Sequence, residues 1–268
     1  MLSRKTFDAV TELFRDASGI QLSGAKMALV EGRLQKLAQT RGQEDVDAYV
    51  RELLRTRNPD ELRQVVDRLT TNETYFFREP QHFEHLAQFV AQRPPRSAAL
   101  RVWSAASSSG EEAYSIAMVL ADHLGLEPGA PEWLVLGTDL SHAMVEQARR
   151  AVYTMERARH VPQAYLRRFC LKGNDIYTGQ LLVSRELRQR VRFMPGNLMQ
   201  PMTEIGRFDV IFLRNVLIYF DAEGKREIVR RVLGHLAEHG VLYTGHSESI
   251  TNLGLPLRAH APAVYGHA

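Results

Sequence analysis

The chain of 268 residues has a single cysteine, Cys170, so it cannot form an intramolecular disulfide. This usage fits a reducing compartment, and we expect a cytoplasmic protein. No apolar run approaches the ~20 residues of a membrane-spanning helix, and residues 1–8 contain no apolar signal core, so we expect no membrane insertion. Cys, His and Asp residues do not cluster at metal-ligand spacing, and we predict no metal site.

Large net charge is also missing, because the formal value is +3 at pH 7. Such a mild balance is compatible with an acidic partner or with none. The 44% hydrophobic and 24% charged residues are ordinary globular usage. Residues 1–70 contain only helical patterns, for example Met27, Val30, Leu34 and Leu37, which are spaced three and four apart. We therefore predict an all-helical N-terminal domain over 1–70.

The pattern changes after Pro94-Pro95, and we predict a linker with a helix over 71–97 and an α/β domain over 98–268. Apolar strands at 100–103, 133–137, 208–213 and 240–244 alternate with helices at 111–124, 141–151 and 222–235. This alternation predicts a mostly parallel, Rossmann-like sheet covered on both faces, with 240–244 closing the series. Two short strands at 181–184 and 190–194 predict an inserted antiparallel β-subdomain at about 172–195.

The junction between the two parts carries an unusual run, Thr71 to Glu79. It combines the aromatics Tyr75-Phe76-Phe77 with polar side chains at Asn72, Thr74 and Arg78. Exposing three large rings is unfavourable, so the run suits a surface that closes over a small polar ligand. A connecting turn with its aromatics in an interdomain seam is an equally good interpretation of the composition alone.

A run of small residues, 104–110, joins the first strand of the α/β domain to a helix, as in dinucleotide sites. The dinucleotide fingerprint is absent, and Glu111-Glu112 follow the only glycine, Gly110. Carboxylates there would repel a pyrophosphate and suit a cationic ligand such as the sulfonium of S-adenosylmethionine. They also suit the first turn of any helix. Asp139, at the end of the second strand, is well placed to bind a ribose diol.

Several motifs, taken together and in order, resemble those of the bacterial chemotaxis receptor methyltransferases, the CheR family. They are Thr71 to Glu79, Val102 to Ala106, Ser109 to Glu112 with Tyr114-Ser115, Arg214 to Phe220 and Gly245 to Ser249. The resemblance covers nearly the whole chain. It implies a protein-glutamate O-methyltransferase that uses S-adenosylmethionine, yields S-adenosylhomocysteine, and forms glutamyl methyl esters on chemotaxis-type receptors for sensory adaptation.

The resemblance also implies site residues. The donor would contact Asn72, Thr74, Arg78, Glu112, Asp139, Asn197, Leu198, Arg214 and Asn215, and the catalytic residues would be Arg78 and Tyr219. Arg78 would hold either the substrate carboxylate or the donor's own. Without the resemblance, Tyr219 is better read as a core aromatic between Ile218 and Phe220.

Basic side chains of the second predicted helix border its apolar stripe, namely Lys26, Arg33 and Lys36. They are candidates for binding the cytoplasmic domain of a methyl-accepting chemoreceptor, although an isolated helix with such a face is usually just solvated. Two other functions compete with methylation of receptor glutamates: an RNA methyltransferase of the same fold, and a non-catalytic S-adenosylmethionine-binding regulatory module. We favour methylation of receptor glutamates, and expect a monomer with no nucleic-acid partner.

Overall fold

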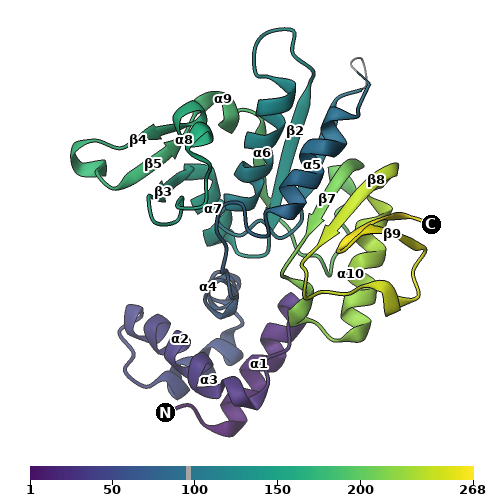
Figure 1. Ribbon diagram of the computed structural model, residues 1–268. Coiled ribbons are helices and arrows are strands. Elements are labelled where there is room, and N and C mark those ends of the chain that lie inside the picture. The colour runs from purple at the N-terminus through teal and green to yellow at the C-terminus, as the bar shows by residue number, and fades with distance from the viewer. Residues whose placement is uncertain (95–97) are drawn as a thin grey trace.

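The computed structural model describes residues 1–94 and 98–268, and its N-terminal part is a group of helices that forms a separate lobe (Figure 1). The fourth helix, α4 (Pro59–Leu69), has a well-defined start, because the Asn58 side chain accepts hydrogen bonds from two backbone N–H groups and Pro59 occupies the first turn. The apolar faces share one core, which includes Phe7, Val10 and Leu34. The helices are α1 (Arg4–Ser18), α2 (Met27–Thr40), α3 (Val46–Thr56) and α4 (Pro59–Leu69), with the 3-10 turn η1 (Gly24–Lys26) before α2. The predicted helical domain is confirmed.

The C-terminal part is built on a seven-stranded sheet with the order β6-β2-β1-β7-β8-β10-β9. Neighbours from β6 to β8 run parallel, and β10 and β9 are antiparallel additions at one edge. The strands are β1 (Leu100–Ser104), β2 (Trp133–Asp139), β6 (Val191–Pro195), β7 (Phe208–Leu213), β8 (Leu236–Thr244), β9 (Leu257–Ala261) and β10 (Val264–His267). The mostly parallel sheet is confirmed. The expectation that residues 240–244 close the series is wrong, since β9 and β10 follow.

Alternation along the strands sends neighbouring side chains to opposite faces of this sheet. Val102 and Phe212 belong to a core shared with α5, α6 and α7, whereas Trp103 and Ile211 belong to a core shared with α10. Both faces are therefore covered by helices, as the continuous apolar strands require. The helices are α5 (Gln81–Ala91), α6 (Glu111–Leu124), α7 (His142–Arg150) and α10 (Ala222–Gly234).

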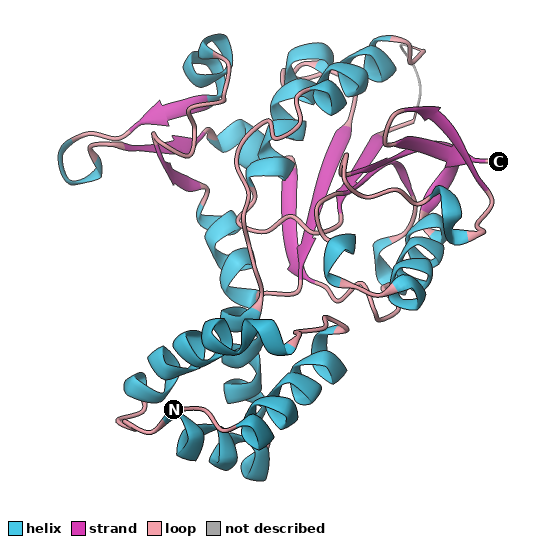
Figure 2. Ribbon diagram, turned by 60° about the horizontal axis from the view of Figure 1, so that its bottom comes forward, coloured by secondary structure: helices cyan, strands magenta, loops and turns pink. Residues whose placement is uncertain are grey.

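A second, three-stranded sheet stands apart from the large one (Figure 2). Its strands pair antiparallel in the order β3-β5-β4. They are β3 (Val152–Thr154), β4 (Cys170–Lys172) and β5 (Gln180–Val183), with α8 (Gln163–Phe169) and η2 (Asp175–Tyr177) between them and α9 (Arg185–Arg188) after them. The inserted antiparallel element that the sequence predicts is therefore present.

The predicted bounds of that insertion, 172–195, are wrong at both ends. The small sheet begins at β3, near residue 152, and Val191–Pro195 belongs to the large sheet, where it pairs parallel with β2. The physical reason is burial, because β6 places Val191 and Phe193 in the core with α6. A strand of five residues carries no local signal for the sheet that it joins.

The linker boundary expected at Pro94-Pro95 and residue 97 lies in part outside the described residues. The linker does contain α5, whose residues Phe83 and Leu86 are buried against the large sheet. Within the described ranges, no helix has the length and apolarity to cross a membrane.

Candidate functional site

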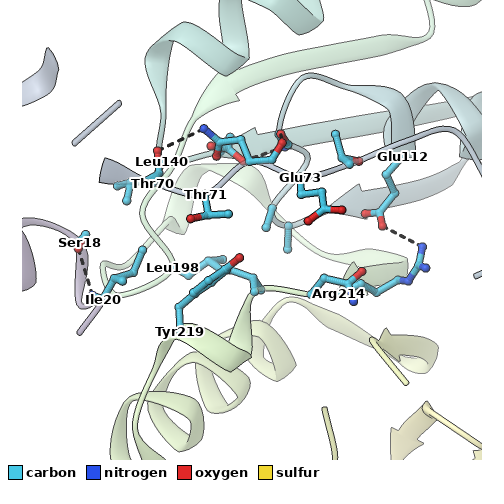
Figure 3. A pocket seen from close by; sticks show the side chains of 18 of the residues that line it. Ser18, Ile20, Thr70, Thr71, Glu73, Glu112, Leu140, Leu198, Arg214 and Tyr219 are labelled. Atoms are coloured by element: carbon cyan, nitrogen blue, oxygen red, sulfur yellow. Dashed lines mark hydrogen bonds and ion pairs between the residues drawn. The ribbon is translucent and has the colours of Figure 1, made fainter. Parts of the chain in front are cut away.

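A pocket opens at the carboxyl ends of the parallel strands, where the segment after α4 and the N-terminal helices cover it (Figure 3). The space in and around it, open solvent included, is about 1050 Å³. Crevices at the carboxyl ends of strands are the usual ligand sites of α/β sheets. The predicted residues that line it are Asn72, Thr74, Arg78, Glu112, Asp139, Asn197, Leu198, Arg214, Asn215, Tyr219 and Lys26. The separate motifs of the sequence therefore meet around one cavity.

Asp139 ends β2 and faces this pocket with a carboxylate that the backbone holds in place. Its Oδ2 accepts a hydrogen bond from the Ser108 N–H at 2.8 Å, and its Oδ1 accepts one from the Ser141 N–H at 2.9 Å. Burial raises the pKa of Asp139 to about 6, against these two hydrogen bonds. A carboxylate offers about four lone-pair positions, so capacity remains for two ligand hydroxyls.

Glu112 and Arg214 form a buried charged pair at the other side of the pocket (Figure 3). Glu112 accepts from the Ser104 hydroxyl at 2.7 Å and from Arg214 Nη1 at 3.0 Å. Arg214 Nη2 lies 3.0 Å from Glu79 Oε2 and also donates to the Arg78 carbonyl. Burial raises the pKa of Glu112, and Arg214 opposes that rise. Arg214 thus connects Glu112 to the end of the run Thr71 to Glu79, which we call the aromatic-run segment.

Glu111, which precedes Glu112 in the sequence, does not line the pocket. It is fully buried and lies 2.6 Å from Arg157 Nη2, while the Ser109 hydroxyl donates to its second oxygen. Arg157 also donates to the Thr74 carbonyl at 3.3 Å. Of the two adjacent glutamates, only Glu112 lines the pocket, and it is paired there with Arg214.

Arg78 and Tyr219 both line this pocket. Arg78 Nη1 donates to the Glu73 carbonyl at 2.9 Å, and its guanidinium carbon lies 5.8 Å from the centre of the Tyr75 ring. Tyr219 follows β7 in the turn η4 (Leu217–Tyr219), and its ring points into the cavity in Figure 3. Burial raises the pKa of Tyr219, so its hydroxyl stays protonated at neutral pH. Tyr219 also packs against the core shared with α10, so it is both a core aromatic and part of the pocket wall.

The N-terminal lobe completes the wall of the pocket. Asn197 Nδ2 donates to the Ala17 carbonyl at 2.9 Å, and Ser18 and Ile20 reach the cavity. Between them Gly19 has φ 75°, and a Cβ there would lie 2.5 Å from the Met199 side chain. Only glycine meets both conditions without strain. The helical domain is thus attached to the α/β domain beside the site.

These features coincide with matches to known proteins. Residues 5–70 match the CheR methyltransferase all-alpha domain, and residues 72–259 match the CheR methyltransferase SAM binding domain. The chain belongs to the CheR methyltransferase family. The chemotaxis protein methyltransferase of Escherichia coli (strain K12) is 38% identical over 98% of this chain and 91% of that protein. Chemotaxis protein methyltransferase 1 of Pseudomonas aeruginosa is 38% identical over 90% of each chain. The protein is therefore a methyltransferase with S-adenosylmethionine as its donor.

The pocket residues fit that donor by their chemistry. Asp139 provides acceptors for a diol, and the small side chains of Ala105 and Ala106 allow close approach to the backbone before α6. Leu198 and Phe220 add apolar surface, which suits the face of a heterocycle. Glu112 lines the pocket with a carboxylate that suits an ammonium, while the Arg214 guanidinium is paired with Glu112 and Glu79.

The three basic residues expected to bind substrate are not equivalent in this CheR methyltransferase. Lys26 lies at the pocket, and Lys36 is exposed on α2 away from it. Arg33 Nη1 donates to the Leu69 carbonyl at 2.8 Å and to the Thr70 carbonyl at 3.1 Å, so it secures the end of α4. Its helix face is basic, but its guanidinium is largely committed to the fold.

Sequence reasoning missed part of the wall. Ser18 and Ile20 reach the pocket only because of the turn at Gly19, and no local pattern indicates that α1 ends beside the donor site. Thr71 and Glu73, by contrast, lie within the run already singled out, and the polar character of that run was the signal. Arg157 lies outside the pocket lining, and no local pattern indicated that it would pair with Glu111.

Proposed function

We propose that this enzyme transfers the methyl group of S-adenosylmethionine to glutamate side chains on the cytoplasmic domain of a methyl-accepting chemoreceptor. The products are glutamyl methyl esters, which serve sensory adaptation, and S-adenosylhomocysteine. We place the enzyme in the cytoplasm as a monomer without a nucleic-acid partner. Its relatives in Escherichia coli and Pseudomonas aeruginosa are chemotaxis protein methyltransferases, which supports this acceptor.

One observation carries the proposal: the Arg78 guanidinium and the Tyr219 hydroxyl face the cavity that also contains the donor-type groups. A guanidinium recognises a carboxylate through a planar fork of N–H donors. A glutamate with a pKa of ~4.3 is already ionised at neutral pH, so no general base is required. The site needs only to position the acceptor, and these two groups are suited to do that.

For the donor we propose all the residues that the family resemblance implies. Asp139 accepts from the ribose hydroxyls, Glu112 faces the ammonium, and Arg214 steadies Glu112 through the 3.0 Å pair. Asn197 and Leu198 lie at the strand end where the adenine would sit. The proposed donor-binding residues are Asn72, Thr74, Arg78, Glu112, Asp139, Asn197, Leu198, Arg214 and Asn215.

When bound, the donor supplies a methyl group on a positively charged sulfur. Arg78 and Tyr219 hold one carboxylate oxygen in line with that methyl, so that a C–O bond forms as the C–S bond breaks. The carboxylate loses its negative charge in this step, and the sulfonium becomes a neutral thioether. Arg78 then faces a neutral ester, and the loss of the ion pair favours product release.

Receptor recognition is proposed for the basic face of η1 and α2. Methylation sites of this kind lie among several carboxylates, and a positive face steers such a partner and fixes its register. Lys26 stands at the pocket and Lys36 farther along the helix, so the face leads toward the donor. Arg33 contributes charge there while its Nη1 remains on the α4 carbonyls.

The test is transfer of labelled methyl from S-adenosylmethionine to receptor-containing membranes or to RNA. Label on a membrane protein that is released by mild base identifies a carboxyl methyl ester. Stable label on RNA would identify the competing methyltransferase function, and donor binding without transfer to either would identify a regulatory module. Arg78→Ala serves as the control, because it should transfer little methyl while the other proposed donor-binding residues still bind the donor.

A further inference from the structure

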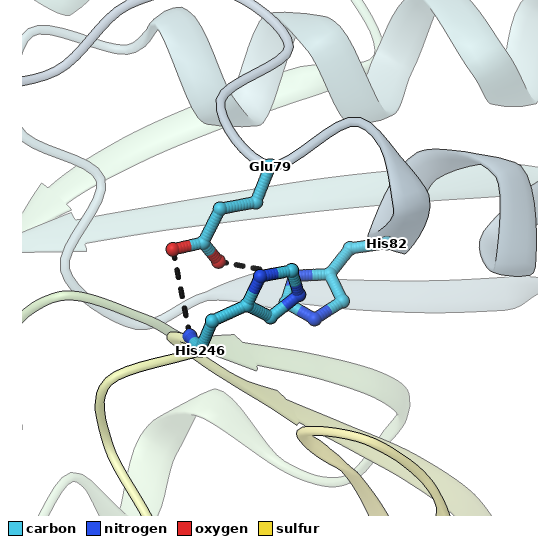
Figure 4. Close-up of side chains that lie close together, drawn as sticks. All are labelled: Glu79, His82 and His246. Atoms are coloured by element: carbon cyan, nitrogen blue, oxygen red, sulfur yellow. Dashed lines mark hydrogen bonds and ion pairs between the residues drawn. The ribbon is translucent and has the colours of Figure 1, made fainter.

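Glu79, His82 and His246 converge on one point beside the pocket without lining it (Figure 4). Glu79 ends the aromatic-run segment, His82 lies in the first turn of α5, and His246 follows β8. One potential ligand atom of each residue lies within 4.8 Å of the other two. Glu79 Oε2 is 3.5 Å from His82 Nδ1, and the two imidazole rings meet edge to face with centres 4.7 Å apart.

His82 is the informative member of this cluster. Only 1% of its surface is exposed, yet neither ring nitrogen has a hydrogen-bond partner among the described residues. Buried polar groups without partners are rare, because their desolvation is not compensated. His85, one turn later on the same helix, is satisfied by the Tyr243 hydroxyl at 2.8 Å. Packing alone would favour an apolar side chain at position 82, so its imidazole has another use.

The charges beside the cluster are compatible with a cation. Arg214 lies between two carboxylates, Glu79 and Glu112, at 3.0 Å from each. Two ionised carboxylates and one guanidinium together carry one negative charge, so Arg214 does not exclude a divalent ion.

We propose that Glu79, His82 and His246 bind one Zn²⁺ ion or a similar divalent transition-metal ion. Two imidazoles and a carboxylate are a typical zinc donor set, whereas Mg²⁺ and Ca²⁺ prefer oxygen ligands alone. Ligand atoms about 2 Å from a tetrahedral ion are about 3.4 Å apart, close to the Glu79–His82 separation. His246 is exposed and can rotate to complete the site. The bound ion would tie the loop after β8 to the start of α5 and leave a fourth position open.

The experiment uses the full chain without a histidine tag, after treatment with a chelator. ZnCl₂ is titrated in competition with a chromophoric chelator, and CoCl₂ is titrated while the visible absorption of tetrahedral Co²⁺ is followed. We expect one ion per chain and tetrahedral Co²⁺ bands. Loss of an outer-shell partner typically weakens metal binding about 10–100-fold, so loss of a ligand should weaken it at least tenfold.

The variants are His246→Ala, at an exposed position, and His82→Phe, which keeps an aromatic ring in the buried space. The control is His239→Ala, an exposed histidine elsewhere on the surface. The site variants should lose at least tenfold in Zn²⁺ affinity and lose the Co²⁺ bands, and the control should match the parent. Should His82→Phe not fold, His246→Ala decides alone. Absence of one-to-one binding, or equal affinity in His246→Ala and the parent, overturns the proposal.

Discussion

Arg78→Ala separates a role in catalysis from a role in folding. The Arg78 side chain makes one hydrogen bond, from Nη1 to the Glu73 carbonyl at 2.9 Å, and stacks over Tyr75 at 5.8 Å. A net hydrogen bond contributes about 0.5–1.5 kcal/mol, and an exposed cation–π contact about 0.5–1 kcal/mol. The substitution should therefore lower the free energy of unfolding by about 1–2.5 kcal/mol.

The expected loss in turnover is larger. If Arg78 holds the acceptor carboxylate in the transition state, its removal resembles removal of a positioned hydrogen-bond donor, which costs about 10²–10³-fold in kcat. Donor affinity should change less than kcat, because the other donor-binding groups of the pocket remain. Urea unfolding, calorimetry with S-adenosylmethionine and initial rates of receptor methylation measure the three quantities separately.

Arg214→Ala is the matched control, since both arginines line the same pocket. The Arg214 side chain is 1% exposed and lies 3.0 Å from both Glu79 and Glu112. Breaking such a buried pair should cost about 3–5 kcal/mol of stability. The reasoning fails if Arg78→Ala destabilises the protein as much as Arg214→Ala does while the remaining folded enzyme turns over normally.

Three further outcomes are expected. With a pKa of about 6 for Asp139, its ionised fraction falls from about 0.97 at pH 7.5 to about 0.24 at pH 5.5, so donor affinity measured by calorimetry should fall about fourfold. Asp139→Asn should bind the donor weakly at both pH values. A steep pH dependence of donor affinity in that variant would show that another group titrates. The double variant Lys26→Glu/Lys36→Glu should slow receptor methylation at low salt and reduce its salt sensitivity. Adding Arg33→Glu should also lower the melting temperature, because Arg33 donates to the Leu69 carbonyl. Equal rates for the parent and the double variant would show that this basic face does not bind the receptor. Arg157→Met should lower the free energy of unfolding by about 3 kcal/mol at pH 8, because it leaves the buried Glu111 carboxylate without its partner. The loss should be smaller at pH 5, where Glu111, whose pKa is raised by burial, can take up a proton. Equal denaturation curves for variant and parent at pH 8 would show that the Arg157–Glu111 pair contributes nothing.

The sequence by itself determined the elements and much of the site. Helical spacing identified the N-terminal helices, and apolar runs identified β1, β2, β7 and β8. These properties depend on residues a few positions apart, so a local pattern contains them. The donor-site residues follow strand ends or lie in the aromatic run, and parallel strands bring their carboxyl ends to one edge.

Only the tertiary structure decided how distant segments pair. Val191–Pro195 joins the large sheet, β9 and β10 extend it, and Glu111 turns to Arg157 while its neighbour Glu112 turns to the pocket. The convergence of Glu79 and His82 with His246 likewise depends on α5 packing beside the end of β8. Strand edges and charged side chains accept many partners of similar local energy, and burial of the whole chain selects among them.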